Sequence, residues 1–151
     1  MLPPETIAEI DRLVYDTSDS SAQLSGIAAL ESAEALQRLA FIHNWDDGFG
    51  VPTAIANHSK CDLGTALNLF WLAEALCWFS GEIKPDEHNR DWVAFCELIT
   101  NRIVGGLYRQ GATSCKVPLG IVKRHLLKKQ GVPEILITDV QGEVPAPFSV
   151  T

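Results

Sequence analysis

The segment HNWDDGFGVPTAIANHSKCDLGTALNLFWLAEALCWF, residues 43–79, says most about the architecture of this chain. It begins at the end of a helix and continues as a turn, in which Gly48 or Gly50 takes the left-handed conformation that stops a helix. Pro52 then predicts the first turn of a short helix. Asp62 is a good N-cap for a long helix that ends at residue 79. Since this helix is apolar nearly all round, we expect it to be buried at the centre, with Leu67, Phe70 and Leu76 in the core.

Hydrophobic periodicity predicts more helices on both sides of this segment. Apolar residues recur at helical spacing over residues 3–16, 20–44 (as two helices or one bent helix), 92–103 and 119–129. The run EILITD, residues 134–139, is the one expected strand, and the Gln-Gly pair after it can turn into a second short strand. We therefore predict a mainly α, compact single domain over residues 1–151, with six or seven helices and a short C-terminal β segment.

One stretch of the segment has the form of a repeat unit. VPTAIANHSKCDLGTALNLFWLA, residues 51–73, reads as a short helix, a tight link and a long helix. This order is typical of a unit of the helical-pair solenoids, in which each unit buries its apolar face on its neighbours. No second copy is evident, so a helical-repeat-like fold is an alternative to a simple bundle.

The cysteines and the N-terminal residues bear on the compartment. The four cysteines contain no CxxC pair, so we interpret them as reduced thiols of a cytoplasmic protein. The first ten residues hold two prolines and two glutamates, which is not the pattern of a signal peptide. Asn68 and Glu74 interrupt the apolar run of residues 63–79, which is also too short for a membrane span.

Charge is distributed unevenly along the chain. Residues 1–100 hold 16 acidic and 5 basic side chains, a net charge of −11, whereas residues 101–151 carry a net charge of +4. Acidic side chains at a surface attract a basic partner over a long range and raise its association rate. Nucleic-acid or membrane binding is not expected from a chain with this acidic balance. The candidate partner-binding residues are Trp45, Asp46, Asp47, Glu82, Asp86, Glu87 and Asp91.

The NWDDG turn also contains residue types that do chemistry. His43, Asp46 and Asp47, with His58 and Cys61 further on, are residue types that bind metal ions. Their spacing matches no metal motif, and no nucleophile elbow or phosphate loop occurs in the chain. We expect no catalytic residue, metal or cofactor. The turn is expected to be architectural first, with the two aspartates accepting hydrogen bonds from backbone N–H groups and Gly48 at positive φ.

The residues from Asn44 to Leu67 resemble the hallmark of a family of small bacterial proteins, domain of unknown function 4274. The resemblance rests on the Asn-Trp-Asp-Asp-Gly turn, the proline after it and the helix start Cys-Asp-Leu-Gly-Thr-Ala-Leu. It implies a helical, bacterial, cytosolic protein and names no catalytic residue. Small families of this sort are frequently encoded beside secreted toxins as immunity proteins, which is an association and not a physical argument.

Three functions follow as hypotheses. The first is a non-enzymatic immunity protein that binds a basic toxin through its acidic surface. The second is a small metal-dependent enzyme centred on His43, Asp46, Asp47 and His58. The third is a regulatory or structural subunit of a larger complex. A cleft with convergent His and Asp side chains favours the second, and a large exposed apolar patch favours the third. The oligomeric state and the identity of a partner do not follow from the sequence.

Overall fold

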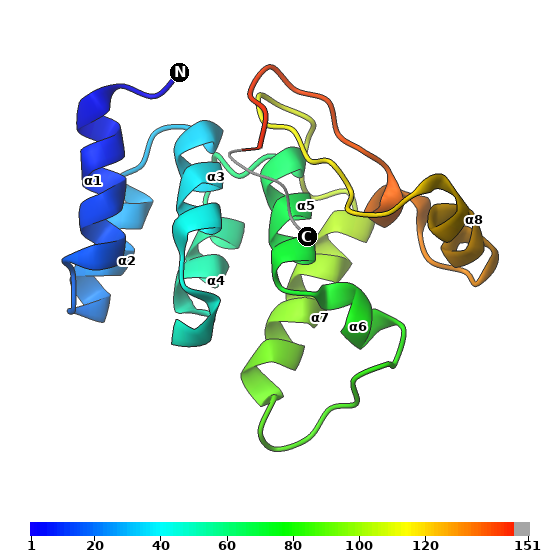
Figure 1. Ribbon diagram of the computed structural model, residues 1–151. Helices are drawn as coiled ribbons and strands as arrows, with labels where there is room; N and C mark the ends of the chain where they lie inside the picture. The colour runs from blue at the N-terminus through cyan, green and yellow to red at the C-terminus, as the bar shows by residue number, and fades with distance from the viewer. Residues whose placement is uncertain (147–151) are drawn as a thin grey trace.

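The computed structural model describes residues 1–146, and these residues form a compact, mainly helical fold of eight α-helices (Figure 1). The count exceeds the predicted six or seven because the long central helix is broken in two. Two short 3-10 helices, η1 (Trp45–Asp47) and η2 (Glu134–Ile137), complete the secondary structure. The α-helices are α1 (Pro4–Tyr15), α2 (Ser20–Ala28), α3 (Ala33–Ile42), α4 (Gly50–Asn57), α5 (Leu63–Leu72), α6 (Ala75–Phe79), α7 (Arg90–Val104) and α8 (Ile121–Lys129).

Helices α1 to α5 and α7 alternate in direction and stack side by side in two layers, whereas α6 lies across the end of α5 and α8 lies at one end of the molecule (Figure 1). One layer contains α1, α3 and α5, each packed on the next, and in the other α2 packs on α4, while α7 packs on α5 (Figure 1). This is the arrangement of stacked helical hairpins. Because each hairpin reverses the chain, the turns at residues 16–19, 43–49 and 80–89 all lie at the same edge of the array.

Helix α5 lies at the centre of this array and packs on α3, α4, α6 and α7. Asp62 is its N-cap, as predicted, and accepts a hydrogen bond from the Thr65 backbone N–H at 3.0 Å. Leu67 and Phe70 are fully buried, which confirms the apolar pattern. Leu76 is only partly buried, because it belongs to the next, shorter helix.

The helix predicted to run unbroken to residue 79 stops at Leu72 and restarts at Ala75. Glu74, between the two, is exposed and has a left-handed backbone with φ of 56°. The break leaves the Ala73 carbonyl without a helical partner, and the Trp92 indole N–H from α7 donates to it at 2.7 Å. A tertiary contact thus satisfies the broken helix end, which hydrophobic periodicity alone does not reveal.

The predicted C-terminal strand is wrong. Residues 134–137 form η2, whose Leu136 and Ile137 are buried and which packs on α7. No strand is assigned in residues 1–146, where two isolated β-bridges, Thr113 with Val144 and Cys115 with Val140, are the extended pairings. A run of three apolar residues, Ile135 to Ile137, fits a buried 3-10 turn as well as a strand.

No helix within the described residues is long and apolar enough to cross a membrane.

Candidate partner-binding surface

The NWDDG turn is built by Asn44, Trp45 and Gly48. The Asn44 side-chain oxygen accepts a hydrogen bond from the Asp46 N–H at 3.1 Å, and the Trp45 indole N–H donates to the Ala40 carbonyl at 3.2 Å. Gly48 has φ of 100° and ψ of −167°, a conformation restricted almost to glycine. Asn44 therefore caps the turn in place of the two aspartates that we expected to do so.

The carboxylates of Asp46 and Asp47 are exposed to solvent. The Asp47 carboxylate accepts one long hydrogen bond, from the Asn44 amide at 3.4 Å, and the fold makes little other use of either group. A partner can therefore contact these carboxylates with little loss of hydrogen bonding within the fold.

Trp45 is half-buried and anchors the turn to the helices through aromatic contacts. Its ring lies 5.6 Å from the His43 ring, 6.1 Å from Phe49 and 6.0 Å from Phe95 of α7, all edge to face. Phe49 and Phe95 stack at 5.5 Å. Trp45 is thus partly exposed, and its buried edge fixes the position of the neighbouring aspartates.

His43 is held inside this cluster as a neutral base. Burial lowers its pKa below the ordinary value, although a hydrogen bond to the Gly48 carbonyl and the charge of Asp47 act in the opposite direction. Its Nε2 lies 3.1 Å from the Gly48 oxygen, so this nitrogen carries the proton and donates. The ring therefore supports the turn, and Nε2 is not free to bind a metal.

The second acidic cluster lies in the connection from α6 to α7. Asp86 is structural, because its carboxylate accepts hydrogen bonds from the His88 N–H at 2.7 Å and the Asn89 N–H at 2.9 Å. Glu82, Glu87 and Asp91 are exposed, and Glu87 lies 3.5 Å from the exposed His88 ring. The cluster thus divides into one carboxylate that builds the turn and three that face solvent.

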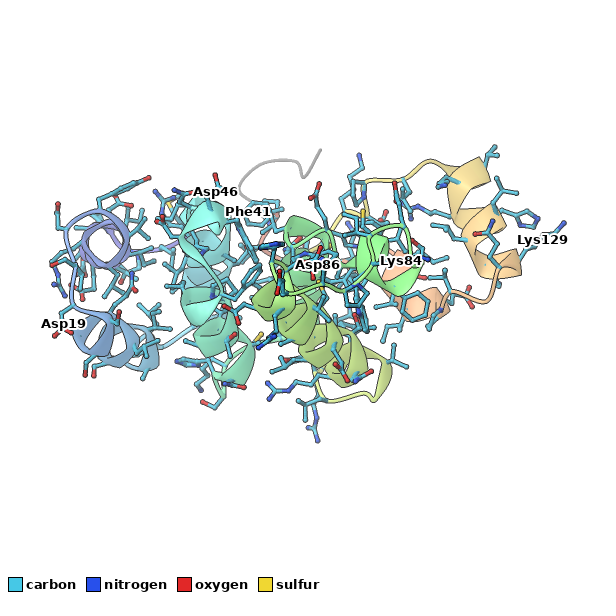
Figure 2. The ribbon with its side chains drawn as sticks, turned by 90° about the horizontal axis from the view of Figure 1, so that it is seen from below. Asp19, Phe41, Asp46, Lys84, Asp86 and Lys129 are labelled. Atoms are coloured by element: carbon cyan, nitrogen blue, oxygen red, sulfur yellow. The ribbon has the colours of Figure 1, made fainter. Side chains whose placement is uncertain are left out.

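The hairpin topology brings both clusters to one edge. Figure 2, seen from below, shows Asp19, Asp46 and Asp86 on three successive hairpins of this edge, together with Lys84. Helices pack about 10 Å apart, so neighbouring turns repeat at this interval. Among the eight acids of this edge lie Lys84 and Arg90, and Arg12 in the last turn of α1 interacts with Asp16. We name as the acidic edge the residues Asp16, Asp19, Asp46, Asp47, Glu82, Asp86, Glu87 and Asp91.

The CDLGTAL motif has a structural role. The Asp62 carboxylate is buried and accepts from the Thr113 N–H at 3.0 Å and from the Thr113 hydroxyl. Thr65 contacts the same hydroxyl at 3.0 Å, and the Asn68 amide donates to the Ser114 carbonyl at 3.0 Å. A Cβ on Gly64 would lie 2.4 Å from the Thr113 carbonyl oxygen. The motif therefore clamps the segment at residues 113–114 onto α5, a role that our sequence analysis missed.

The alternative metal site does not assemble. His43, Asp46 and Asp47 lie at one end of α4, whereas His58 and Cys61 lie beyond the other. Eight residues of helix separate the two sets by about 12 Å. The His58 Nδ1 already accepts a hydrogen bond from the Lys60 N–H at 3.0 Å. Within residues 1–146 no three histidine, cysteine or acidic side chains converge as metal ligands.

The four cysteines are free, as expected from their spacing. Burial raises the pKa of the thiols of Cys61, Cys96 and Cys115 to about 12. Cys115 lies in a loop, yet it is only 1% exposed. None of these three is a nucleophile at neutral pH, since the thiolate is the reactive form.

An apolar groove of about 690 Å³ lies between α2, α4 and α7. Phe49 and Phe95 of the aromatic cluster contribute to its wall, and Leu24 of α2 is 44% exposed there. Asp91 of the acidic edge is the one charged side chain that lines it. The other lining residues are Gly50, Thr53, Ala54, Asn57, Ala94 and Leu98.

The described residues thus define an all-α domain of stacked helical hairpins, with an acidic edge and an apolar groove beside it. Residues 31–104, which span α3 to α7, match the family model described as Domain of unknown function (DUF4274). This match confirms the resemblance inferred from the NWDDG and CDLGTAL motifs. Searches of curated proteins and of solved structures found no match.

Proposed function

We propose that this protein is a non-enzymatic, cytoplasmic binding module, an immunity protein that neutralises a basic toxin through the acidic edge. The observation that carries the proposal is the gathering of acidic turns from three hairpins on one edge (Figure 2). Acidic residues that are far apart in sequence lie together at this edge, so their electrostatic fields add on one side of the molecule. Such a field raises the encounter rate with a basic protein.

The chemistry of the edge suits binding better than catalysis. Asp46, Glu87 and Asp91 are exposed to solvent, whereas the catalytic groups of enzymes commonly lie in clefts that exclude water. The separation of His43 from His58 by α4 disfavours the metal-dependent enzyme. Trp45, half-buried beside Asp46, adds an aromatic group of the kind enriched at the energetic centre of interfaces.

A regulatory or structural subunit is the second candidate. Helix α8 favours it, because Ile121, Val122 and Leu126 are 87%, 75% and 47% exposed on that helix. Exposed apolar side chains that cluster on one element are typical of a surface covered by another protein.

The test of the first proposal is co-expression with the product of the neighbouring gene, followed by pull-down and rescue of growth. We expect the neighbour to be toxic alone and harmless with this protein. Association of the purified pair should slow as salt rises to about 0.5 M, where the Debye length is about 4 Å.

Charge reversal locates the binding surface. Asp46→Lys with Glu87→Lys should slow association further, because both exposed carboxylates face the partner. Asp86 is left intact since it builds its turn. The matched control is Glu31→Lys with Glu143→Lys, which changes the net charge equally at exposed positions outside the acidic edge. A non-toxic neighbour, or equal effects of the two double variants, would remove the immunity proposal.

A further inference from the structure

Helix α8 presents a basic, apolar face that is exposed to solvent in the part of the chain that the structure describes. Leu127 is the one buried side chain of the helix. On the same side of the helix, the Arg124 guanidinium donates hydrogen bonds to the Leu119 carbonyl at 2.9 Å, the Val117 carbonyl at 2.9 Å and the Asp139 carboxylate at 3.0 Å. On the opposite side of the helix, Val122 and Leu126 are exposed.

The exposed side of α8 has the pattern of a docking helix. Val122 and Leu126 are one turn apart and therefore share a face, and Ile121 lies beside them. Lys129 lies on the same face, one turn after Leu126, and Lys123 lies to one side of it; both are exposed. An amphipathic helix of this kind binds in an apolar groove with acidic surroundings.

The groove between α2, α4 and α7 has the complementary properties. Its wall includes the exposed Leu24 and the aromatic pair Phe49 and Phe95. Asp91 is the charged residue among those that line it, and Glu97 is exposed on α7 next to the lining residue Leu98. Arg102 lies near one end of the groove, where it donates a hydrogen bond to the side-chain oxygen of the lining residue Asn57 at 2.5 Å. The groove therefore offers apolar area and negative charge where α8 offers apolar area and positive charge.

Helix α8 cannot fill the groove of its own chain. It lies at one end of the molecule, whereas α2 and α4 lie toward the other end (Figure 1). We propose that two copies of this chain form a two-fold dimer in which α8 of each copy docks in the groove of the other. A two-fold axis forms both contacts at once and closes the assembly. This proposal does not rest on the immunity function.

Sedimentation equilibrium of the purified chain tests association. In about 0.05 M salt, the mass should rise from 16.5 kDa toward twice that value between about 5 and about 500 µM, and salt at about 0.5 M should reverse the rise. Val122→Ala with Leu126→Ala should raise the dissociation constant at least about tenfold, since both side chains bury apolar surface. Their exposure predicts unchanged folding, which circular dichroism checks.

A charge swap tests the pairing of the two surfaces. Lys123→Glu with Lys129→Glu places an acidic helix against an acidic groove, and Asp91→Lys with Glu97→Lys places a basic helix against a basic groove. Each double variant alone should be monomeric. An equimolar mixture should form a heterodimer, because one of its contacts is fully reversed and the other is of wild-type sign.

Native mass spectrometry resolves the mixture, and three results would overturn the proposal. These are a wild-type chain that stays monomeric at every concentration, a dimer that persists in either double variant, and a mixture that does not associate. A mass that grows beyond two copies would contradict the closed, two-fold arrangement. The assay contains no other protein, so its failure leaves the toxin experiment unaffected, and the reverse also holds.

Discussion

Asp62→Ala should destabilise the fold by more than the loss of a helix cap. In the wild type this buried carboxylate accepts from the Thr65 N–H at 3.0 Å and from the Thr113 N–H at 3.0 Å. Loss of an N-cap costs about 1 kcal/mol. The buried Thr113 N–H is then left without a partner, which costs about 1–3 kcal/mol more. We therefore expect the free energy of unfolding to fall by about 2–4 kcal/mol.

Asp19→Ala is the matched control. Asp19 caps α2 by accepting from the Ser21 N–H at 3.1 Å, but it is exposed and holds no distant segment. This change should cost about 1 kcal/mol or less. Urea unfolding followed by circular dichroism measures both losses, with the m-value checking that the unfolding transition is unchanged.

Asp62→Asn separates the contribution of the helix cap from that of the hydrogen bond to the Thr113 N–H. Its amide oxygen can still accept from Thr65, whereas its NH₂ group cannot accept from the Thr113 N–H. The free energy of unfolding of Asp62→Asn should therefore lie between that of the wild type and that of Asp62→Ala. If Asp62→Ala costs no more than Asp19→Ala, the carboxylate does not clamp the Thr113 segment and the reasoning is refuted.

Three further predictions concern the turn and the thiols. Gly48→Ala should cost about 1–3 kcal/mol at φ of 100°, while Gly50→Ala, at ordinary φ and with free space, should be nearly neutral; equal costs in urea would contradict this assignment. Because burial lowers the pKa of His43 in the folded state, the free energy of unfolding of the wild type should fall as the pH falls below about 6.5. In the same urea assay, His43→Gln should lose less stability between about pH 7.5 and about pH 5.5. At about pH 8, a thiol reagent should modify the half-buried Cys77 before the buried thiols of Cys61, Cys96 and Cys115. Prompt reaction of a second thiol in the native state would show that burial does not protect these three cysteines.

Helix starts and the central core were predictable because they depend on local chemistry. Asp62 caps α5 where an aspartate precedes an apolar helix, and Gly48 ends its turn at positive φ. Leu67 and Phe70 are buried since apolar residues cover every side of their helix. These features need no knowledge of the rest of the chain.

The misplaced elements depend on contacts between distant residues. The helix breaks at Glu74, where the Trp92 indole N–H donates to the Ala73 carbonyl. Glu74 interrupts the apolar run in the sequence, but a single glutamate is a good helix former and does not predict a helix end. Leu136 and Ile137 have strand-like composition, yet they fold into a 3-10 turn that packs on α7. Short apolar runs stay ambiguous until their partner is known.

In the candidate partner-binding surface, too, features set by the local sequence were predictable, whereas those set by distant contacts were not. Exposure of Asp46, Asp47 and Glu87 was predictable from acidic residues in turns. The partner of Asp62 was not, because Thr113 is 51 positions away and the GATSC segment carries no signal for it. Asp86 was assigned to the partner surface with its neighbours, but its two backbone hydrogen bonds give it a structural role.

The fold places the acidic and the basic side chains of the sequence at different parts of the surface. Alternating hairpins carry the acidic turns at residues 16–19, 43–49 and 80–89 to one edge, while α8 carries its lysines to one end (Figures 1 and 2). A net charge of −7 would by itself repel a second copy. Separated charges of opposite sign instead orient an approaching molecule before contact, so a basic toxin and a second copy through α8 would both be steered toward the acidic residues. Asp91 belongs to the acidic edge and also lines the groove, so a partner bound across it would compete with dimer formation.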